Sequence, residues 1–346
     1  MPSLKSLLSL LSLRAITLAL AHNSSNPLLA TGANLTFALP THPVHTFPVG
    51  TWIENLAVRE NGQIIATDDT HPRIYQIDPY YSHTPALLLH EFNNTASILG
   101  IVETTPDVFY VCTANYSSAK LEGYGEAYIY RLDMRPFSSS IKNSAVISKI
   151  ATLLEAKALD GLTWLEPRDD AEGEGLLLIS DFLAGVIWSV KPATGAVAMP
   201  INSTYTRSTG FGVNGLKIRN RKLYLTNSQQ QTLVKVLINS KGEAVGNYTV
   251  LAQGGFTPDD FALDAEGNAY VTSFEVGRNG VVFVPREGGQ AVYIPGMAGP
   301  TAAAFGRGRE EGWLYVSTSG GDYDYLTGKE VTAAGGIVRV QVGGRG

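Results

Sequence analysis

Four oxygen-bearing residues hold equivalent places in similar short phrases and together could bind a metal ion. Glu54 in IENLAV, Asp160 in LDGLTW, Asn214 in VNGLKI and Asp259 in PDDFAL are each the second residue of their phrase. Carboxylate and amide oxygens are the ligands that calcium prefers, and magnesium also uses them while keeping more water. We expect one divalent metal, calcium, held by Glu54, Asn214 and Asp259, with Asp160 or Asp260 as an additional ligand.

The same acidic residues are the candidate catalytic groups. These are Asp259, Asp260 and Asp160; in a hydrolytic enzyme, Asp259 or Asp260 would serve as the base for a metal-bound water. The alternative is that each one only caps a turn, since Asp and Asn side chains bond nearby backbone N–H groups. Four oxygen-bearing residues at equivalent positions favour a shared site.

Aromatic residues gather in the segments around these phrases and predict an apolar, unsaturated ligand rather than a sugar. Any single one could instead belong to the core. The candidate substrate-binding aromatics are Trp52, Trp164, Phe211, Phe256, Phe274, Tyr116 and Tyr124.

The histidines exclude several kinds of site. All six precede residue 91, and only His71, in TDDTHP, is placed to reach the site. We count His71 as a candidate substrate-binding residue. We therefore expect neither a Ser-His-Asp triad nor a multi-histidine zinc site, and the sequence has no G-x-S-x-G, P-loop or C-x-x-C motif.

A repeated phrase predicts the fold that positions these residues. A short strand ending in Thr or Ser recurs roughly every 46 residues, with one longer interval, and several short strands accompany it each time. Such a period is typical of β-propellers. The repeated residues are Thr67, Thr113, Ser180, Thr226, Thr272 and Ser317.

We therefore predict an all-β fold, a six-bladed β-propeller over residues 34–346. The sixth unit reaches the C-terminus without a fourth strand, and residues 34–50 can supply it, which leaves no long edge unpaired. The phrases that carry Glu54, Asp160, Asn214 and Asp259 then lie at one mouth of the central channel, together with the loops between second and third strands.

Composition and the N-terminus bear on partners and location. The net charge of -5 carries no basic stripe, so nucleic acid is not an expected partner. Residues 1–21 resemble a secretory signal peptide cleaved after Ala21, although Arg14 leaves a short membrane anchor open as an alternative. No later segment has about 20 uninterrupted apolar residues. We expect a monomer that acts on small molecules.

N-glycosylation sequons agree with a secreted or secretory-pathway protein. Cys112 is the single cysteine, so no internal disulfide forms, and we expect it to be a buried small side chain. The sequons lie at Asn23, Asn34, Asn93, Asn115, Asn202 and Asn247.

The phrases WIENLAV, VNGLKI and PDDFALDAEGNAYVT resemble those of the senescence-marker and gluconolactonase family of six-bladed propellers. The resemblance implies that Glu54, Asn214 and Asp259 hold one divalent metal. The chain departs from that family at Leu99, near where lactonases place polar substrate-binding residues, and at Leu159, where the family has Asn. At these departures, and in the phrase GPTAAAFGR, the sequence is more similar to a fungal secretory branch of the superfamily. That branch includes hetero-Diels–Alderases of tropolone–sesquiterpene biosynthesis.

This resemblance implies a pericyclase that joins a tropolone-derived quinone methide to a humulene-like sesquiterpene alkene in secondary-metabolite biosynthesis. A cycloaddition requires no nucleophile and no proton relay, which agrees with the distribution of histidines. Two alternatives stay open: a metal-dependent lactonase or esterase of the gluconolactonase type, and a secreted binding propeller without chemistry.

Overall fold

The computed structural model describes most of the chain beyond the N-terminal segment. The predicted signal peptide and the sequons at Asn23 and Asn34 lie outside the described residues. Among the residues described, no helix is long and apolar enough to cross a membrane. The described ranges are 35–81, 84–117, 122–138, 144–167, 175–275, 278–289, 291–321 and 334–342.

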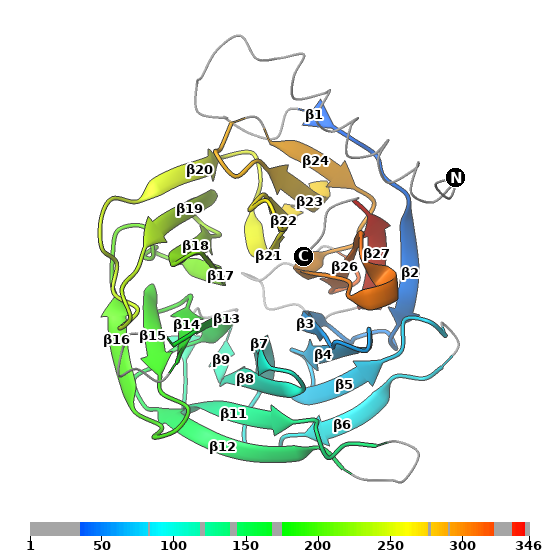
Figure 1. The fold of residues 1–346 in the computed structure, drawn as a ribbon, viewed down its shortest axis with the longest axis horizontal. Coiled ribbons are helices and arrows are strands. Elements are labelled where there is room, and N and C mark those ends of the chain that lie inside the picture. Colours follow the sequence, from blue (N-terminus) through cyan, green and yellow to red (C-terminus); the bar gives the residue numbers. More distant parts are fainter. Residues whose placement is uncertain are drawn as a thin grey trace.

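Six antiparallel sheets of four principal strands surround a central channel, which confirms the predicted six-bladed propeller (Figure 1). The first three blades follow one another along the chain. Blade one holds β3 (Ile53–Val58), β4 (Ile64–Asp68), β5 (Arg73–Ile77) and β6 (Leu87–Glu91); blade two holds β7 (Ser97–Thr105), β8 (Val108–Ala114), β11 (Ala127–Asp133) and β12 (Val146–Leu153); blade three holds β13 (Leu159–Leu165), β14 (Leu176–Asp181), β15 (Val186–Val190) and β16 (Val197–Ile201).

The remaining blades continue the same order from the channel outward. A small hairpin of β9 (Tyr116–Ser117) and β10 (Glu122–Gly123) extends blade two. Blade four holds β17 (Val213–Arg219), β18 (Lys222–Asn227), β19 (Thr232–Leu237) and β20 (Thr249–Gln253); blade five holds β21 (Pro258–Leu263), β22 (Ala269–Glu275), β23 (Arg278–Val284) and β24 (Val292–Pro295); blade six holds β25 (Pro300–Phe305), β26 (Trp313–Thr318) and β27 (Gly336–Gln341), with the 3-10 turn η1 (Gly308–Glu310) between its first two strands.

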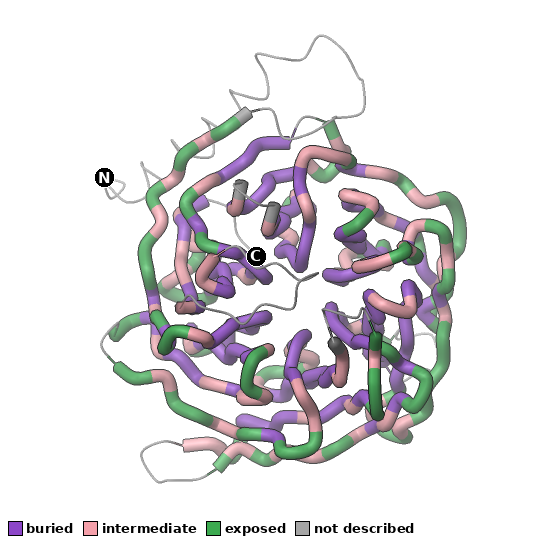
Figure 2. Tube along the Cα trace, turned by 180° about the vertical axis from the view of Figure 1, so that it is seen from behind, coloured by how far each residue is buried: buried purple, intermediate pink, exposed green. Residues whose placement is uncertain are grey.

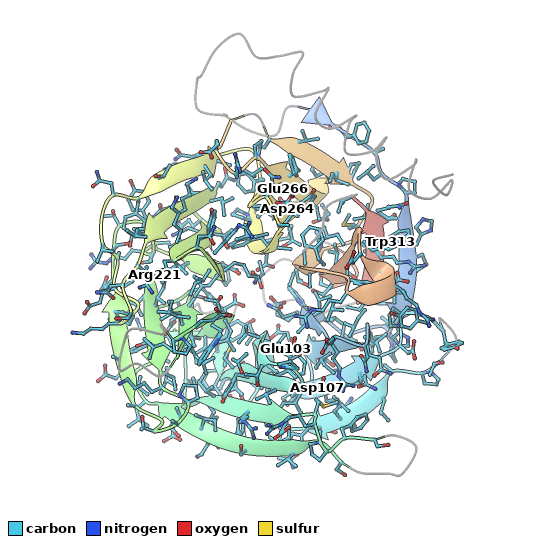
Figure 3. The ribbon with its side chains drawn as sticks, viewed as in Figure 1. Glu103, Asp107, Arg221, Asp264, Glu266 and Trp313 are labelled. Atoms are coloured by element: carbon cyan, nitrogen blue, oxygen red, sulfur yellow. The ribbon has the colours of Figure 1, made fainter. Side chains whose placement is uncertain are left out.

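The N-terminal strand closes the ring, as predicted. β2 (Thr41–Thr46) pairs antiparallel with β27 and becomes the fourth strand of blade six. The contact is reinforced by Trp313 of β26, which is labelled in Figure 3. His42 of β2 packs edge-on against its ring, and the Arg339 guanidinium lies 4.5 Å from the ring centre. The sequence did not predict β1 (Leu35–Thr36), which adds in parallel to β24 of blade five.

Burial falls from the channel outward. β3 and β4 are buried along their whole length, whereas β6 and β16 are largely exposed (Figure 2). Apolar side chains on both faces of the inner strands pack against neighbouring blades, and this burial is the main source of stability. The rigid inner strands position the residues of the channel mouth.

A hydrogen bond from each blade to the next explains the repeated Thr or Ser. In each blade, one side chain near the end of the second strand donates to a backbone carbonyl near the start of the inner strand of the next blade. One such bond is worth about 0.5–1.5 kcal/mol. The six bonds are Thr67 to Leu99 (2.6 Å), Cys112 to Asp160 (2.9 Å), Ser180 to Asn214 (2.5 Å), Thr226 to Asp259 (2.6 Å), Thr272 to Thr301 (2.7 Å) and Ser317 to Glu54 (3.2 Å).

Blade two departs from the sequence alignment. The equivalent residue is Cys112, whose thiol donates to the Asp160 carbonyl, and not its neighbour Thr113. The Thr113 hydroxyl instead accepts from the backbone N–H of Tyr128 within its own blade. Cys112 is buried, as predicted, but it also holds the head of blade three in place.

Candidate functional site

Bulges in the inner strands direct the residues at the start of these strands into the channel. We call these the head residues: Glu54, Asp160, Asn214 and Asp259. The pairing register shifts between Leu159 and Leu162 in blade three and between Val213 and Leu216 in blade four. A glycine lies inside each bulge, and a Cβ on Gly161 would stand 2.3 Å from the Asn214 carbonyl oxygen. Glycine therefore lets adjacent inner strands approach closely enough for their heads to meet.

Three carboxylates and one amide meet at this mouth. One ligand oxygen from each of Glu54, Asp160 and Asp259 lies within 4.8 Å of the others, and all three residues are buried. Asn214 joins them from the head of blade four, and its buried Oδ1 has no hydrogen-bond partner. The structure thus brings together the three predicted metal ligands and Asp160.

Burial and mutual repulsion raise the pKa values in this cluster. Burial, and then the charges of Asp259 and Asp160, raise the pKa of Glu54 well above its ordinary value, against the hydrogen bond from the Trp52 indole. Burial, followed by the Asp260 charge, raises the pKa of Asp160 to about 8. The pKa of Asp259 is also raised, first by burial and then by Asp160.

The donor set fits a hard divalent cation. Three carboxylates this close repel one another, and a cation between them would remove the repulsion that raises their pKa values. The same cation would also satisfy the Asn214 Oδ1 atom, which otherwise bears the cost of burial without a partner.

Asp260 lies apart from this cluster, although the sequence grouped it with Asp259. Both residues lie within the register shift between Pro258 and Phe261, where the regular alternation of the strand is interrupted. Both Asp260 oxygens accept from Lys217 Nζ, at 2.6 and 2.8 Å, and Asn55 Nδ2 donates to one of them at 3.0 Å.

A pocket opens above the carboxylates and is walled by aromatic rings. Phe182 packs at the centre of one wall, 5.2 Å from Phe211 and 5.4 Å from Tyr116 between ring centroids. Of the predicted substrate-binding residues, the pocket is lined by Trp52, Tyr116, Phe211 and Phe274.

The other four predicted substrate-binding residues lie elsewhere. Phe256 is only 1% exposed within the packing between blades four and five, and Trp164 packs over Gly175 and the core of blades two and three. Tyr124 is exposed at 55% beyond the hairpin. His71 is exposed, with Nδ1 3.3 Å from Asp68 Oδ2. None of the four lines the pocket among the described residues.

Two pocket residues, Phe182 and Ser228, were not predicted from the sequence, whereas Leu99 lines the pocket near the substrate-binding position named for it. The repeat contained a signal for Phe182 and Ser228. Phe182, Ser228 and Phe274 each stand two residues after the repeated Thr or Ser of blades three, four and five. The end of the second strand, or the first loop residue after it, therefore places the same repeat position over the cluster.

Comparisons with known proteins agree with the resemblance read from the phrases. Residues 206–320 match the family described as SMP-30/Gluconolactonase/LRE-like region. The resemblance to gluconolactonase-type propellers is confirmed. The matched segment contains Asn214 and Asp259, two of the four cluster residues.

Relatives cover nearly the whole chain. A Phoma sp. protein named as a candidate hetero-Diels-Alderase is 26% identical, over 91% of this chain and 94% of its own length. A protein of the same description from Sarocladium schorii is 27% identical, over 81% and 78%. The solved structure of a calcium-binding regucalcin from Agrobacterium tumefaciens shares the fold, with a TM-score of 0.58 and 13% identity over 89% of this chain and 96% of that one.

Proposed function

We propose that this protein is a hetero-Diels–Alderase of secondary-metabolite biosynthesis. Its substrates would be a tropolone-derived quinone methide and a humulene-like sesquiterpene alkene, joined by one new C–C bond and one new C–O bond. Support comes from the two fungal relatives, whose names give this activity and whose alignments span 91% and 81% of this chain.

The single observation that carries the proposal is an aromatic pocket placed directly over oxygen-bearing groups. Trp52, Tyr116, Phe182, Phe211 and Phe274 supply apolar walls, and the carboxylate cluster forms the floor. No histidine, lysine or cysteine lines this pocket among the described residues. A concerted cycloaddition suits such a site because it requires no nucleophile and no proton relay.

The walls would catalyse by orientation and enclosure. Holding a diene and an alkene in near-attack geometry is worth about 7–11 kcal/mol in favourable cases. Phe182 is fixed between Phe211 and Tyr116, so its ring offers a preorganised face for the flat quinone methide. Enclosure also keeps water from adding to the reactive partner.

The floor would polarise the heterodiene. Glu54, Asp160, Asn214 and Asp259 would hold one divalent cation, which we propose is calcium because every donor is oxygen. When bound, the ion supplies Lewis acidity toward the heterodiene oxygen. The Trp52 indole N–H donates to Glu54 and so fixes the orientation of this carboxylate.

We also propose that the protein is a glycosylated monomer of the secretory pathway. The signal-like segment and the sequons support this location. Asn93, Asn202 and Asn247 are exposed, so these three sequons are accessible to glycosylation.

A substrate panel tests the reaction class. Purified protein is incubated separately with an aldonolactone, with an aryl ester, and with a quinone-methide precursor plus humulene. The proposal expects turnover only in the third mixture. Hydrolysis of the lactone without cycloadduct would assign the site to a gluconolactonase-type hydrolase, and no turnover at all would favour a binding propeller.

A further inference from the structure

A hydrogen-bonded bridge crosses the channel and involves three different blades. Asn55 comes from β3 of blade one, Lys217 from β17 of blade four and Asp260 from β21 of blade five. Blades one and four face each other across the ring (Figure 1). Asp260 accepts from both partners, so the bridge spans the channel from one side to the other.

The bridge lies beneath the carboxylate cluster. Asp260 follows Asp259 directly, and Lys217 follows Asn214 by three residues toward the opposite mouth. On its far side Lys217 lines a second cavity, with Ile101, Leu162 and Phe305 among its walls. The bridge therefore separates the aromatic pocket from a second chamber.

Charge gives the bridge a role beyond closing the channel. Lys217 contacts both oxygens of Asp260, at 2.6 and 2.8 Å, and so neutralises a fourth carboxylate beside Glu54, Asp160 and Asp259. Asn55 fixes the Asp260 carboxylate from the other side. The backbone N–H of Phe261 also donates to Asp260 Oδ1, so the carboxylate is held by three residues and loses hydrogen bonds if it turns toward its neighbours.

We propose that Lys217 is a positioning residue that holds Asp260 out of the cation site and sets the charge that a bound divalent cation meets. This inference rests on the cation of the proposed function. Lys217 acts as an internal counter-ion: with it, the cation meets three uncompensated carboxylates, and without it the cation meets four. Lys217 and Asp260 thus change cation affinity in opposite directions.

A charge cycle tests this, with calcium affinity measured by calorimetry on chelator-treated full-length protein at fixed pH and ionic strength. We expect Lys217→Met to tighten calcium binding about tenfold and Asp260→Asn to weaken it about tenfold, since each changes the local charge by one. The double variant restores the wild-type charge and returns to about the wild-type affinity. The matched control Lys222→Met, at an exposed lysine of β18, leaves it unchanged.

The outcomes separate this inference from the one it rests on. If wild-type protein binds no divalent cation, both the cation assignment and this inference are wrong. If wild type binds calcium but both single variants weaken binding, the bridge is only structural and this inference alone is overturned. If Lys217→Met does not fold, Lys217→Gln keeps a hydrogen bond to Asp260 without the charge and must still tighten binding.

Discussion

The aromatic wall can be tested by comparing two phenylalanines that the sequence treated as equivalent. Phe211 lines the pocket and is partly exposed, whereas Phe256 is 1% exposed within the packing between blades. We predict that Phe211→Ala changes the ratio of cycloadduct stereoisomers, because one face of the substrate loses its support. We predict that Phe256→Ala leaves that ratio unchanged.

The stabilities should differ in the opposite sense. Replacing a buried Phe by Ala costs about 3–5 kcal/mol, so Phe256→Ala should lower the free energy of unfolding by that amount. Phe211 is only partly buried and loses its contact with Phe182, at 5.2 Å between centroids; such a pair is worth about 0.5–1.5 kcal/mol beyond area burial. Denaturant unfolding gives the stability, and chiral chromatography gives the stereoisomers.

The reverse pattern would refute these roles for Phe211 and Phe256. A Phe256→Ala protein that remains folded and yields altered stereoisomers would place that residue in the site. An unaltered stereoisomer ratio in Phe211→Ala would remove the aromatic wall from the account of selectivity.

Three further predictions follow from the cluster, the blade contacts and the closure. Burial raises the pKa of Asp160 to about 8, so the folded protein binds more protons than the unfolded chain above about pH 4. Metal-free protein should therefore lose thermal stability as the pH rises from about 4 to 8, and calcium should restore that stability at pH 8. A thermal stability that does not change with pH would count against the raised pKa. Cys112→Thr should keep a donor to the Asp160 carbonyl and cost little, whereas Cys112→Val leaves that carbonyl unpaired and should cost about 1–3 kcal/mol; equal unfolding midpoints for the two variants would argue against the contact. Deleting residues 34–50 removes β2 and bares the edge of β27, so the truncated protein should aggregate on size-exclusion chromatography, and a soluble monomer would contradict the closure.

The sequence predicted the propeller and the heads of its inner strands because both depend on period and position. It could not decide between Cys112 and Thr113, since both are small and adjacent and only the pairing register shows which one faces the next blade. It grouped Asp260 with Asp259 because the two are adjacent, and only the structure shows that Asp260 bonds to Lys217 and Asn55.

The pocket walls were predicted less well, for a related reason. Phe256 and Trp164 lie near head residues in sequence, but their side chains enter the core between blades. Phe182 was overlooked because it lies in a loop after a second strand, yet its repeat position is the one that Phe274 shares. Whether a residue lines this site depends on the direction of its side chain, which bulges and loops set.

The enantiomeric excess of the cycloadduct tests the central claim most directly. An uncatalysed background reaction would also form cycloadduct, so rate alone does not separate catalysis from background. Formed with the wild-type protein in excess over the quinone methide, the cycloadduct should be strongly enriched in one enantiomer, and the mixture without protein should be racemic. A racemic product in both mixtures would contradict the assignment of this pocket as a hetero-Diels–Alderase site.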